Sequence, residues 1–361
     1  MIHAAAWLGW AGGTLVILYT TRNPWYVGLT LVCIAVVRAA VRKRGDGSPP
    51  IPISMTRFGL VVIGFSAIFN ALTVHFGRTV LFSLPEAIPF LGGVVTLEAV
   101  VYGAVNGLVL TGLFAAFTVF NQAISIRQLV RLVPRAFFPV AVVTSIAMTF
   151  VPVTLRQYRA IREAQAVRGH RLRGLRDWLP LLMPLLTGGL ERAFQLAEAM
   201  TARGFAATES TPNNLYLRLI TLTGLTLLTV GWLLRLVWGF SQSGLVILLV
   251  GLGMVIGALW LMGRRVPRTN YRPQLWTGRD WLVVIVTGAA ALTFAAPWPG
   301  LDRSSLFFYP YPVLNWPPFQ PFFGVALLGL LLPGLLILHR PAPEAVAIQR
   351  TLSMDTHHDS I

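Results

Sequence analysis

Apolar residues occur in long runs along most of the chain, and short arginine-rich segments separate these runs. Most runs approach or exceed the roughly 17–25 mostly apolar residues that a membrane-spanning helix needs. The turn Arg22-Asn23-Pro24-Trp25 joins the first two runs into a helical hairpin. The pattern predicts spans at residues 4–19, 25–41, 58–76, 90–121, 215–238, 244–262, 281–296 and 322–338.

One apolar run, residues 137–151, does not fit this pattern. Its roughly 15 residues are fewer than a span needs, and Pro139 and Pro152 bracket it. If it crossed the membrane, the polar segment 156–205 would lie on the side opposite to the basic residues 42–44. We therefore expect this run to be partly embedded and to lead into the polar segment.

Composition and charge place the chain in the membrane class. Of its 361 residues, 55% are hydrophobic and only 12% are charged, whereas soluble domains carry about 25% charged residues. All but one of the 29 basic residues are arginines, and they cluster between apolar runs. This is the pattern of cytoplasmic loops rather than of a basic nucleic-acid-binding face. We therefore predict a lipid bilayer and no nucleic acid as partner.

Three arginines ahead of the short run, Arg127, Arg131 and Arg135, recur at every fourth position. Apolar residues stand between them, so the three lie on one face if the segment is helical. This arrangement predicts an interfacial amphipathic helix at an anionic leaflet.

The run at 90–121 contains two further features. Gly103 and Gly107 have the four-residue spacing of helices that pack closely within a membrane. Glu98 is the one acidic residue well inside an apolar run. An intramembrane carboxylate is a candidate functional site. A glutamate near a helix start is also stabilised by the helix dipole close to solvent, and we favour this second interpretation.

The polar segment 156–205 has helix-forming composition. We expect one helix over 155–167 and another over 190–202, with Gly169, Gly174 and Gly204 as C-terminal stops. Residues 178–186 include Pro180 and Pro184 and are expected to cross back along apolar surface. An apolar face is predicted on the second helix from the spacing of four residues, Leu190, Ala193, Phe194 and Ala197.

Two short sequences in this segment echo each other, Ala166-Val167-Arg168-Gly169 and Thr201-Ala202-Arg203-Gly204. Neither arginine has an acidic residue three or four positions away, so no helix-local salt bridge is available to it. Small neighbours allow a partner's surface to approach, and arginine supplies a rigid fork for carboxylate or carbonyl oxygens. Complementing the helix dipole would explain one such arginine. Two copies favour docking to another protein.

The runs 161–169 and 197–205 resemble the two Ala-Arg-Gly signatures of the transmembrane T component of energy-coupling factor (ECF) transporters, the EcfT/CbiQ-like family. The first reads Val167-Arg168-Gly169 here. The proline-containing stretch 179–186 and the Asn23-Pro24 turn also resemble that family, and the resemblance covers roughly residues 4–240.

The resemblance implies a coupling subunit of an ABC importer. Cytoplasmic helices would insert into grooves of two ABC-type ATPases, and a separate S component would bind a vitamin or a metal ion such as cobalt. The chain itself would have no catalytic residue, metal site or cofactor. The ATPase-docking residues implied are Ala166, Arg168, Gly169, Ala202, Arg203 and Gly204.

These observations predict an all-α, polytopic helical membrane protein with a cytoplasmic helical coupling domain between membrane spans. The segments expected are an N-terminal transmembrane bundle (1–135), a coupling-helix region (136–210), C-terminal transmembrane helices (211–338) and a disordered tail (339–361). We expect a multi-pass cell-membrane protein with both termini in the cytoplasm.

Two other functions remain open from the residues. A self-contained secondary transporter would show internal repeats and polar residues at mid-membrane, but no convincing repeat is found. A membrane-embedded enzyme would need clustered acids or histidines, and the candidates are His170, Asp177, Glu191 and Glu198. These are better explained as solvated faces of the coupling helices. The pair His357 and His358 lacks the further ligands of a metal site.

Overall fold

The computed structural model describes residues 2–43, 54–84, 93–169, 174–205, 215–237, 239–264, 275–298, 300 and 302–339. Within these residues, eight helical segments are long and apolar enough to cross a membrane. This confirms the predicted polytopic all-α architecture, to which the structure adds one two-stranded hairpin. The predicted C-terminal tail and its two histidines lie outside the described residues, and so does His170.

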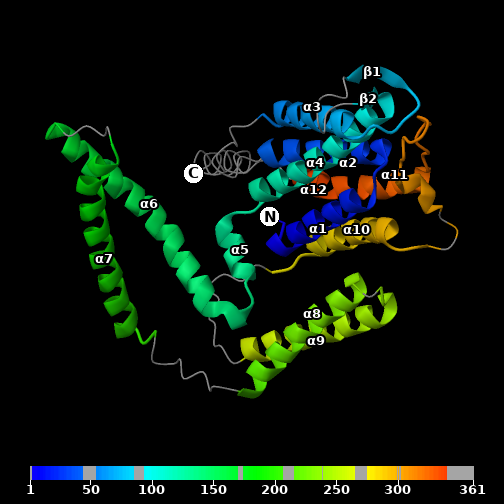
Figure 1. The fold of residues 1–361 in the computed structure, drawn as a ribbon. Coiled ribbons are helices and arrows are strands. Elements are labelled where there is room, and N and C mark those ends of the chain that lie inside the picture. Colours follow the sequence, from blue (N-terminus) through cyan, green and yellow to red (C-terminus); the bar gives the residue numbers. More distant parts are fainter. Residues whose placement is uncertain are drawn as a thin grey trace, which may run out of the picture. The chain divides into compact units, whose positions relative to one another are not determined.

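The chain forms two compact units, residues 1–129 together with 272–361, and residues 130–271. Unit 1 therefore joins the first helices of the chain to the last ones (Figure 1). Its elements are α1 (Ala4–Thr20), α2 (Pro24–Lys43), α3 (Met55–Thr73), β1 (Val80–Leu84), β2 (Gly93–Thr96), α4 (Leu97–Ala123), α10 (Gly278–Ala295), η3 (Arg303–Leu306), α11 (Pro321–Leu328), η4 (Gly329–Leu331) and α12 (Leu332–Leu338).

The core of unit 1 lies where the last helices meet the first two. Helix α1 packs against α10, and α2 packs against α4, α11 and α12. Trp10 of α1 is fully buried, and its indole N–H donates to the Leu330 carbonyl of η4 at 3.0 Å. The rings of Tyr26, Phe294 and Phe323 are also fully buried, and each pair has centroids 5.1–5.9 Å apart. Large buried aromatic rings contribute strongly to packing, so the C-terminal helices complete the N-terminal bundle.

The turn between α1 and α2 fastens the loop that precedes α11. Asn23 is fully buried, and its side-chain amide donates to the carbonyls of Ser305 and Pro318, both at 2.7 Å. Its side-chain oxygen accepts from the backbone N–H of Trp25 at 3.0 Å. Thr21 adds a hydroxyl hydrogen bond to the Leu306 carbonyl at 2.9 Å. The Asn-Pro turn therefore connects the two ends of the chain as well as the first two helices.

We expect Asn23→Leu to destabilise unit 1 by about 2–3 kcal/mol, because it leaves the buried Ser305 carbonyl and the partly buried Pro318 carbonyl without their donor. The measurement is the thermal unfolding midpoint of the purified chain, together with limited proteolysis between residues 302 and 320. Thr20→Ala is the matched control, since the exposed Thr20 hydroxyl bonds only within its own helix. Equal midpoints for the two variants would show that the Asn23 bonds contribute nothing.

The hairpin of β1 and β2 was not predicted from the sequence. It leads into α4, and Glu98 in the first turn of α4 is fully buried. The Glu98 carboxylate accepts backbone N–H bonds from Arg78 at 3.3 Å and Thr79 at 3.1 Å. Glu98 therefore lies at a helix start, as we favoured, but it is enclosed rather than close to solvent. Backbone donors and the helix N-terminus account for it as a structural residue.

Helices α3 and α4 pack at backbone contact. A Cβ built on Gly103 would lie 2.5 Å from the Ser66 carbonyl oxygen, and one on Gly107 would lie 2.7 Å from the Ile63 Cα. The Ser66 hydroxyl also donates to the Gly103 carbonyl at 2.7 Å. The close packing predicted from the spacing of these glycines is confirmed, and α3 is the partner helix.

Unit 2 consists of two pairs of helices and short connecting turns. Its elements are η1 (Arg135–Phe137), α6 (Phe138–Val167), η2 (Leu175–Trp178), α7 (Leu179–Ala202), α8 (Leu215–Val237) and α9 (Ser241–Arg264), and α5 (Ile126–Leu132) crosses its boundary. The predicted stripe of three arginines does not share one helix. Arg127 and Arg131 lie in α5, whereas Arg135 begins η1 after Pro134. Proline fixes its own φ and cannot continue the hydrogen-bond ladder of a helix.

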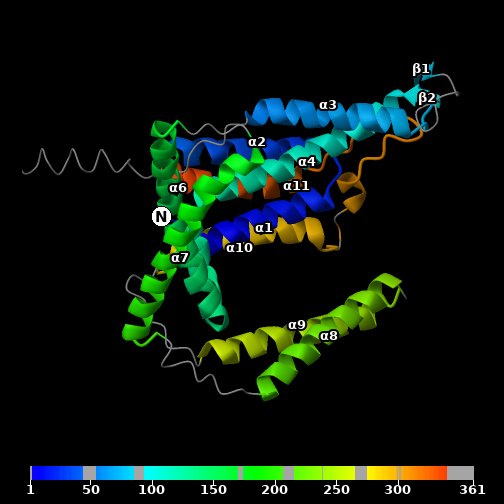
Figure 2. The same cartoon turned by 60° about the vertical axis from the view of Figure 1, so that its left-hand side comes forward.

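Helices α8 and α9 lie side by side along their length (Figures 1 and 2). Two glycines from each helix form the contact. A Cβ on Gly231 would lie 2.9 Å from the Gly244 carbonyl oxygen, and one on Gly251 would lie 2.9 Å from that of Gly224. The seven-residue spacing within each helix keeps its glycines on one face. Most other large side chains of this pair are exposed, as expected for lipid-facing helices.

Candidate functional site

The segment that contains the two Arg-Gly motifs folds as a pair of continuous helices. Helix α6 runs for 30 residues through Pro152, and α7 runs for 24 residues through Pro184. The apolar run 137–151 and the helix expected over 155–167 are thus parts of one helix, and residues 178–186, which we expected as a separate stretch crossing back along apolar surface, belong mainly to the same helix as 190–202. A proline removes one backbone donor within a helix, and the remaining turns keep both helices continuous.

The first half of α6 is apolar enough to count among the candidate spans, and its second half is basic. The run predicted to be partly embedded is thus the first half of one long helix. At 1.5 Å per residue, α6 is about 45 Å long, more than the roughly 30 Å core of a bilayer. Its basic end therefore extends beyond the apolar part by several turns.

Helices α6 and α7 cross at a polar contact. Arg192 Nη2 donates to Gln157 Oε1 at 2.9 Å, and both residues are half-buried. A Cβ built on Gly188 would lie 2.5 Å from Gln157 Nε2, so the glycine makes room for the glutamine. This contact could not be predicted from the sequence, because the partners are 35 residues apart and neither belongs to a motif.

The two motifs have the same backbone geometry. Arg168 ends α6 with φ −78° and ψ 6°, and Arg203 ends α7 with φ −87° and ψ 6°. Each is followed by a glycine with positive φ, 77° at Gly169 and 76° at Gly204. A left-handed residue directly after the last helical turn is a common helix stop that favours glycine. The sequence echo therefore corresponds to two equivalent helix ends.

Further hydrogen bonds define the second helix end. The N–H of Gly204 donates to the Thr201 carbonyl at 2.9 Å, and the N–H of Phe205 donates to the Met200 carbonyl at 3.0 Å. This pair of bonds is the Schellman motif, which satisfies the last carbonyls of a helix. At the first end, the N–H of Gly169 donates to the Ala166 carbonyl at 3.0 Å. Both ends are thus closed by the backbone itself, without the arginine side chains.

All six predicted docking residues are exposed, namely Ala166, Arg168, Gly169, Ala202, Arg203 and Gly204. Neither guanidinium forms a hydrogen bond or an ion pair with a described residue. A position at a helix C-terminus is favourable for a cation, so the dipole explanation fits each arginine singly. It gives no reason for two unpaired, equivalent arginines, which are free to bind a partner's oxygen atoms.

The two motif arginines are separated along the chain by the same number of residues as the two partners of the crossing contact. Arg168 and Arg203 are 35 residues apart, and so are Gln157 and Arg192. Each motif arginine thus lies 11 residues, or about 16 Å of helix, beyond the crossing contact. The two arms that carry the motifs have equal length.

An apolar stripe on α7 is left uncovered among the described residues. Six large side chains at helical spacing are each 43–63% exposed, namely Leu179, Leu182, Met183, Leu186, Leu190 and Phe194. The predicted apolar face around Leu190 and Phe194 therefore exists, but it points away from α6. An exposed contiguous apolar surface marks contact with a membrane or another protein.

No group of three or more metal-ligating side chains occurs among the described residues. Two of the acids that a membrane-embedded enzyme would need, Glu191 and Glu198, lie on exposed positions of α7. Asp177 accepts from the N–H of Gly174 at 2.9 Å in the turn before α7. These acids belong to helix surfaces and turns, so the candidate site is limited to the two helix ends and the crossing contact.

The fold and the site define a polytopic helical membrane protein with a crossed pair of long helices that end in equivalent Arg-Gly turns. The family model described as "CbiQ: Cobalt transport protein" matches residues 3–214. The chain belongs to this family. The match includes both motifs and ends before α8, so α8 to α12 lie outside it.

Curated relatives with similar segments share one name, "Energy-coupling factor transporter transmembrane protein EcfT". The protein from Exiguobacterium sibiricum is 30% identical over 123 residues, which cover 32% of this chain and 40% of the relative. That from Bacillus selenitireducens is 39% identical over 75 residues, 19% and 28% of the two chains. That from Ruminiclostridium cellulolyticum is 28% identical over 111 residues, 28% and 42% of the two chains. The matches thus span less than half the length of these relatives.

Proposed function

We propose that this chain is the transmembrane coupling subunit of an ECF-type ABC importer. It transmits the ATP-driven motion of two cytoplasmic ATPases to an S component that binds a vitamin or a metal ion. The chain itself carries out no catalysis and holds no cofactor. Family membership supports the transporter class, and the equivalence of the two Arg-Gly helix ends carries the proposal. Two equivalent helix ends could each dock to one of the two ATPase subunits in the same way.

Docking in this proposal is an insertion of helix ends into grooves. The glycine and alanine at each end allow close approach, and each arginine supplies a planar fork for carboxylate or carbonyl oxygens. Because the arms are equally long from the crossing contact, the two ATPases would be engaged at corresponding points. The uncovered apolar stripe of α7 would contact the S component or the membrane surface.

A self-contained secondary transporter receives less support. Glu98 and Asp280, the buried carboxylates among the described residues, both accept backbone N–H bonds at helix starts. Carboxylates held in this way brace the fold, whereas an ion pathway needs polar groups that can exchange partners near mid-membrane.

Docking requires both motifs on the cytoplasmic side of the cell membrane, where we also place the two termini. Single cysteines at 168 and 203, in a Cys33→Ser background, test this. The native Cys33 is buried and donates to the Leu327 carbonyl at 3.6 Å, and serine keeps a hydroxyl donor of similar size at this position. We expect both positions to react with a membrane-impermeant maleimide in inside-out vesicles and not in intact cells. Labelling of either position in intact cells would contradict the proposal.

The crossing contact gives a second test. Gln157→Leu removes the acceptor of Arg192, a bond to a charged group that is worth about 1.5–3 kcal/mol when well formed and less at a half-buried position. We expect assembly with the ATPases to persist, because both helix ends remain, and the substrate imported per ATP hydrolysed to fall several-fold. Gln157→Glu should restore the ratio, since it supplies an ion pair to Arg192. Wild-type coupling in the Leu variant would show that the contact does not transmit motion.

A further inference from the structure

Two buried side-chain atoms near the C-terminal ends of α2 and α4 lack a hydrogen-bond partner. They are Nε of Arg38 and Oε1 of Gln122, and both residues are half-buried. Neither side chain forms a hydrogen bond with a described residue. Buried polar groups are nearly always hydrogen-bonded, so an unpartnered donor or acceptor marks a place that a ligand, an ion or a water molecule completes.

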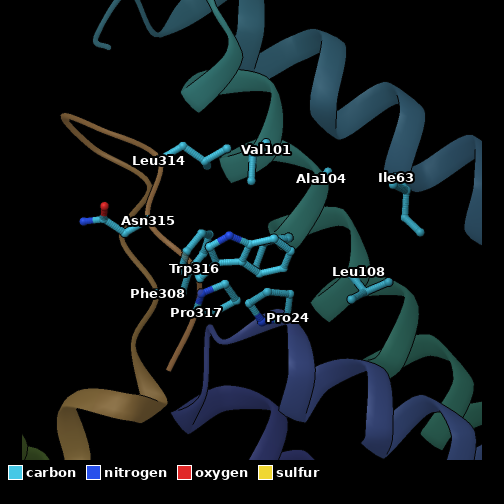
Figure 3. A pocket seen from close by; sticks show the side chains of 11 residues that line it. Pro24, Ile63, Val101, Ala104, Leu108, Phe308, Leu314, Asn315, Trp316 and Pro317 are labelled. Atoms are coloured by element: carbon cyan, nitrogen blue, oxygen red, sulfur yellow. The ribbon is translucent and has the colours of Figure 1, made fainter. Parts of the chain in front are cut away.

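The two side chains lie at the same level of one helix pair. Helices α2 and α4 pack against each other, and they run in the same direction across the membrane because the single span α3 separates them along the chain. Figure 3 shows Pro24, the first residue of α2, beside Leu108 of α4. Arg38 follows Pro24 by 14 residues, and Gln122 follows Leu108 by 14 residues. Each therefore lies about 21 Å further along its helix.

The two side chains also share the faces on which the helices meet. Fourteen residues are close to four helical turns, so Arg38 and Gln122 lie on nearly the same helix faces as Pro24 and Leu108. Pro24 and Leu108 line one cavity together with Ala104, which precedes Gln122 by 18 residues, or five turns. We therefore place both unpartnered atoms at the contact between α2 and α4.

Positive charge gathers at this end of α2 without a described counter-charge. Arg42 stands one turn after Arg38 on the same face, and Lys43 ends the helix. Like charges four residues apart destabilise a helix. Asp46, the next acid in the sequence, lies outside the described residues. Each carboxylate among the described residues of unit 1 accepts backbone N–H bonds instead of pairing with a cation, namely Glu98, Asp280 and Asp302.

The position in the membrane selects the kind of anion. Helix α2 is a candidate span, and Arg38 precedes its last residue by five positions, or about 7.5 Å. An arginine this close to a helix end reaches the membrane interface by snorkelling. Phospholipid phosphates lie at this interface, and basic pockets between membrane helices bind anionic headgroups. A water molecule would satisfy the two atoms but would not compensate the charge.

We propose that the α2–α4 contact at Arg38 binds the headgroup of one anionic phospholipid. The phosphate accepts from the Arg38 guanidinium, which offers a planar fork, and Arg42 adds a second positive charge. A hydroxyl of the headgroup, as in phosphatidylglycerol, donates to Gln122 Oε1. This site is independent of the coupling function, since it needs only a bilayer and none of the docking residues.

Native mass spectrometry of the delipidated full-length chain tests the site with three lipids that have the same acyl chains. Phosphatidylglycerol offers a phosphate and hydroxyls, phosphatidylmethanol offers the charged phosphate alone, and phosphatidylcholine has no net charge. We expect one phosphatidylglycerol to bind saturably and at least about tenfold more tightly than phosphatidylcholine, because a hydrogen bond to a charged group suffices for that difference. It should also bind more tightly than phosphatidylmethanol.

Variants separate the two contacts. Arg38→Gln should remove the preference over phosphatidylcholine, whereas Gln122→Leu should remove only the preference over phosphatidylmethanol. Lys43→Gln is the matched control and should keep both preferences, since it removes one exposed charge from another face of the same helix end. Inorganic phosphate should displace no more lipid than sodium chloride at the same ionic strength.

Three results would overturn the site. Equal binding of phosphatidylglycerol and phosphatidylcholine to the wild type would assign Arg38 to another anion, such as Asp46. Equal losses in Arg38→Gln and Lys43→Gln would indicate attraction by net charge alone. Displacement by inorganic phosphate beyond the salt effect would indicate a site for free anions. The comparison of lipids on the unaltered chain decides even if Arg38→Gln does not fold.

Discussion

Reversing the charge of Arg168 or Arg203 is expected to weaken the complex with the ATPase subunits by about 2–4 kcal/mol, or roughly 30- to 1,000-fold in affinity. This is the range for an arginine at the centre of an interface. Each guanidinium is exposed and unpaired within the described chain, so Arg168→Glu and Arg203→Glu break no internal contact there. The measurement is co-purification with the ATPases, followed by ATP-driven uptake in vesicles.

The matched control is Arg162→Glu, which reverses an exposed charge on α6 less than two turns before the motif. It should leave assembly intact. If the arginines serve only the helix dipole, charge reversal costs at most about 1 kcal/mol of helix stability, and the ATPases still bind. Arg168→Lys keeps the charge but loses the planar fork, so we expect an intermediate affinity. Full assembly and uptake with both Glu variants would refute the docking role.

Replacing the glycines between α3 and α4 is expected to have the largest effect on folding. In Gly103→Leu and Gly107→Leu the new side chain meets the backbone of α3, at Ser66 and Ile63 respectively. Backbone cannot move aside as a flexible side chain does. Overpacking of this kind costs about 1–3 kcal/mol and sometimes more, and the double variant should fail to yield a monodisperse protein. Thermal unfolding in one detergent provides the comparison.

Gly64→Leu on α3 is the control for these variants, since a Cβ there has no atom within 4 Å. Leucine also has a higher helix propensity than glycine, by up to about 1 kcal/mol. The control should therefore unfold at or slightly above the wild-type temperature. A similar midpoint for Gly103→Leu would mean that α3 and α4 separate without loss and that their contact is not specific.

Much of the helical layout follows from the sequence because a bilayer imposes strict rules. Every backbone N–H and C=O group in the hydrocarbon region must find a hydrogen-bond partner within the protein, and a helix provides these partners within one segment. A long apolar run therefore predicts a helix, with bounds close to those observed. The expected runs 215–238 and 244–262 correspond to α8 and α9 in this way. The prolines are less informative, since α6 and α7 continue through Pro152 and Pro184.

The candidate site was found because its signal is local. An arginine followed by glycine after a helical run indicates a helix end, and its repetition drew attention to Arg168 and Arg203. The crossing contact has no such signal. Gln157, Gly188 and Arg192 acquire a role only when two helices pack at these positions, and nothing in their neighbouring residues shows it.

The sequence by itself determined the membrane class, the run of helices and the two equivalent helix ends, since hydrophobic length and local capping need no distant partner. Only the tertiary structure decided that α10 to α12 complete the bundle begun by α1 and α2, and that Asn23 fastens the loop before α11. It also decided the equal arms of α6 and α7 and the cavity beside α4. These depend on contacts between residues far apart in the chain, where shape and hydrogen-bond geometry select the partner.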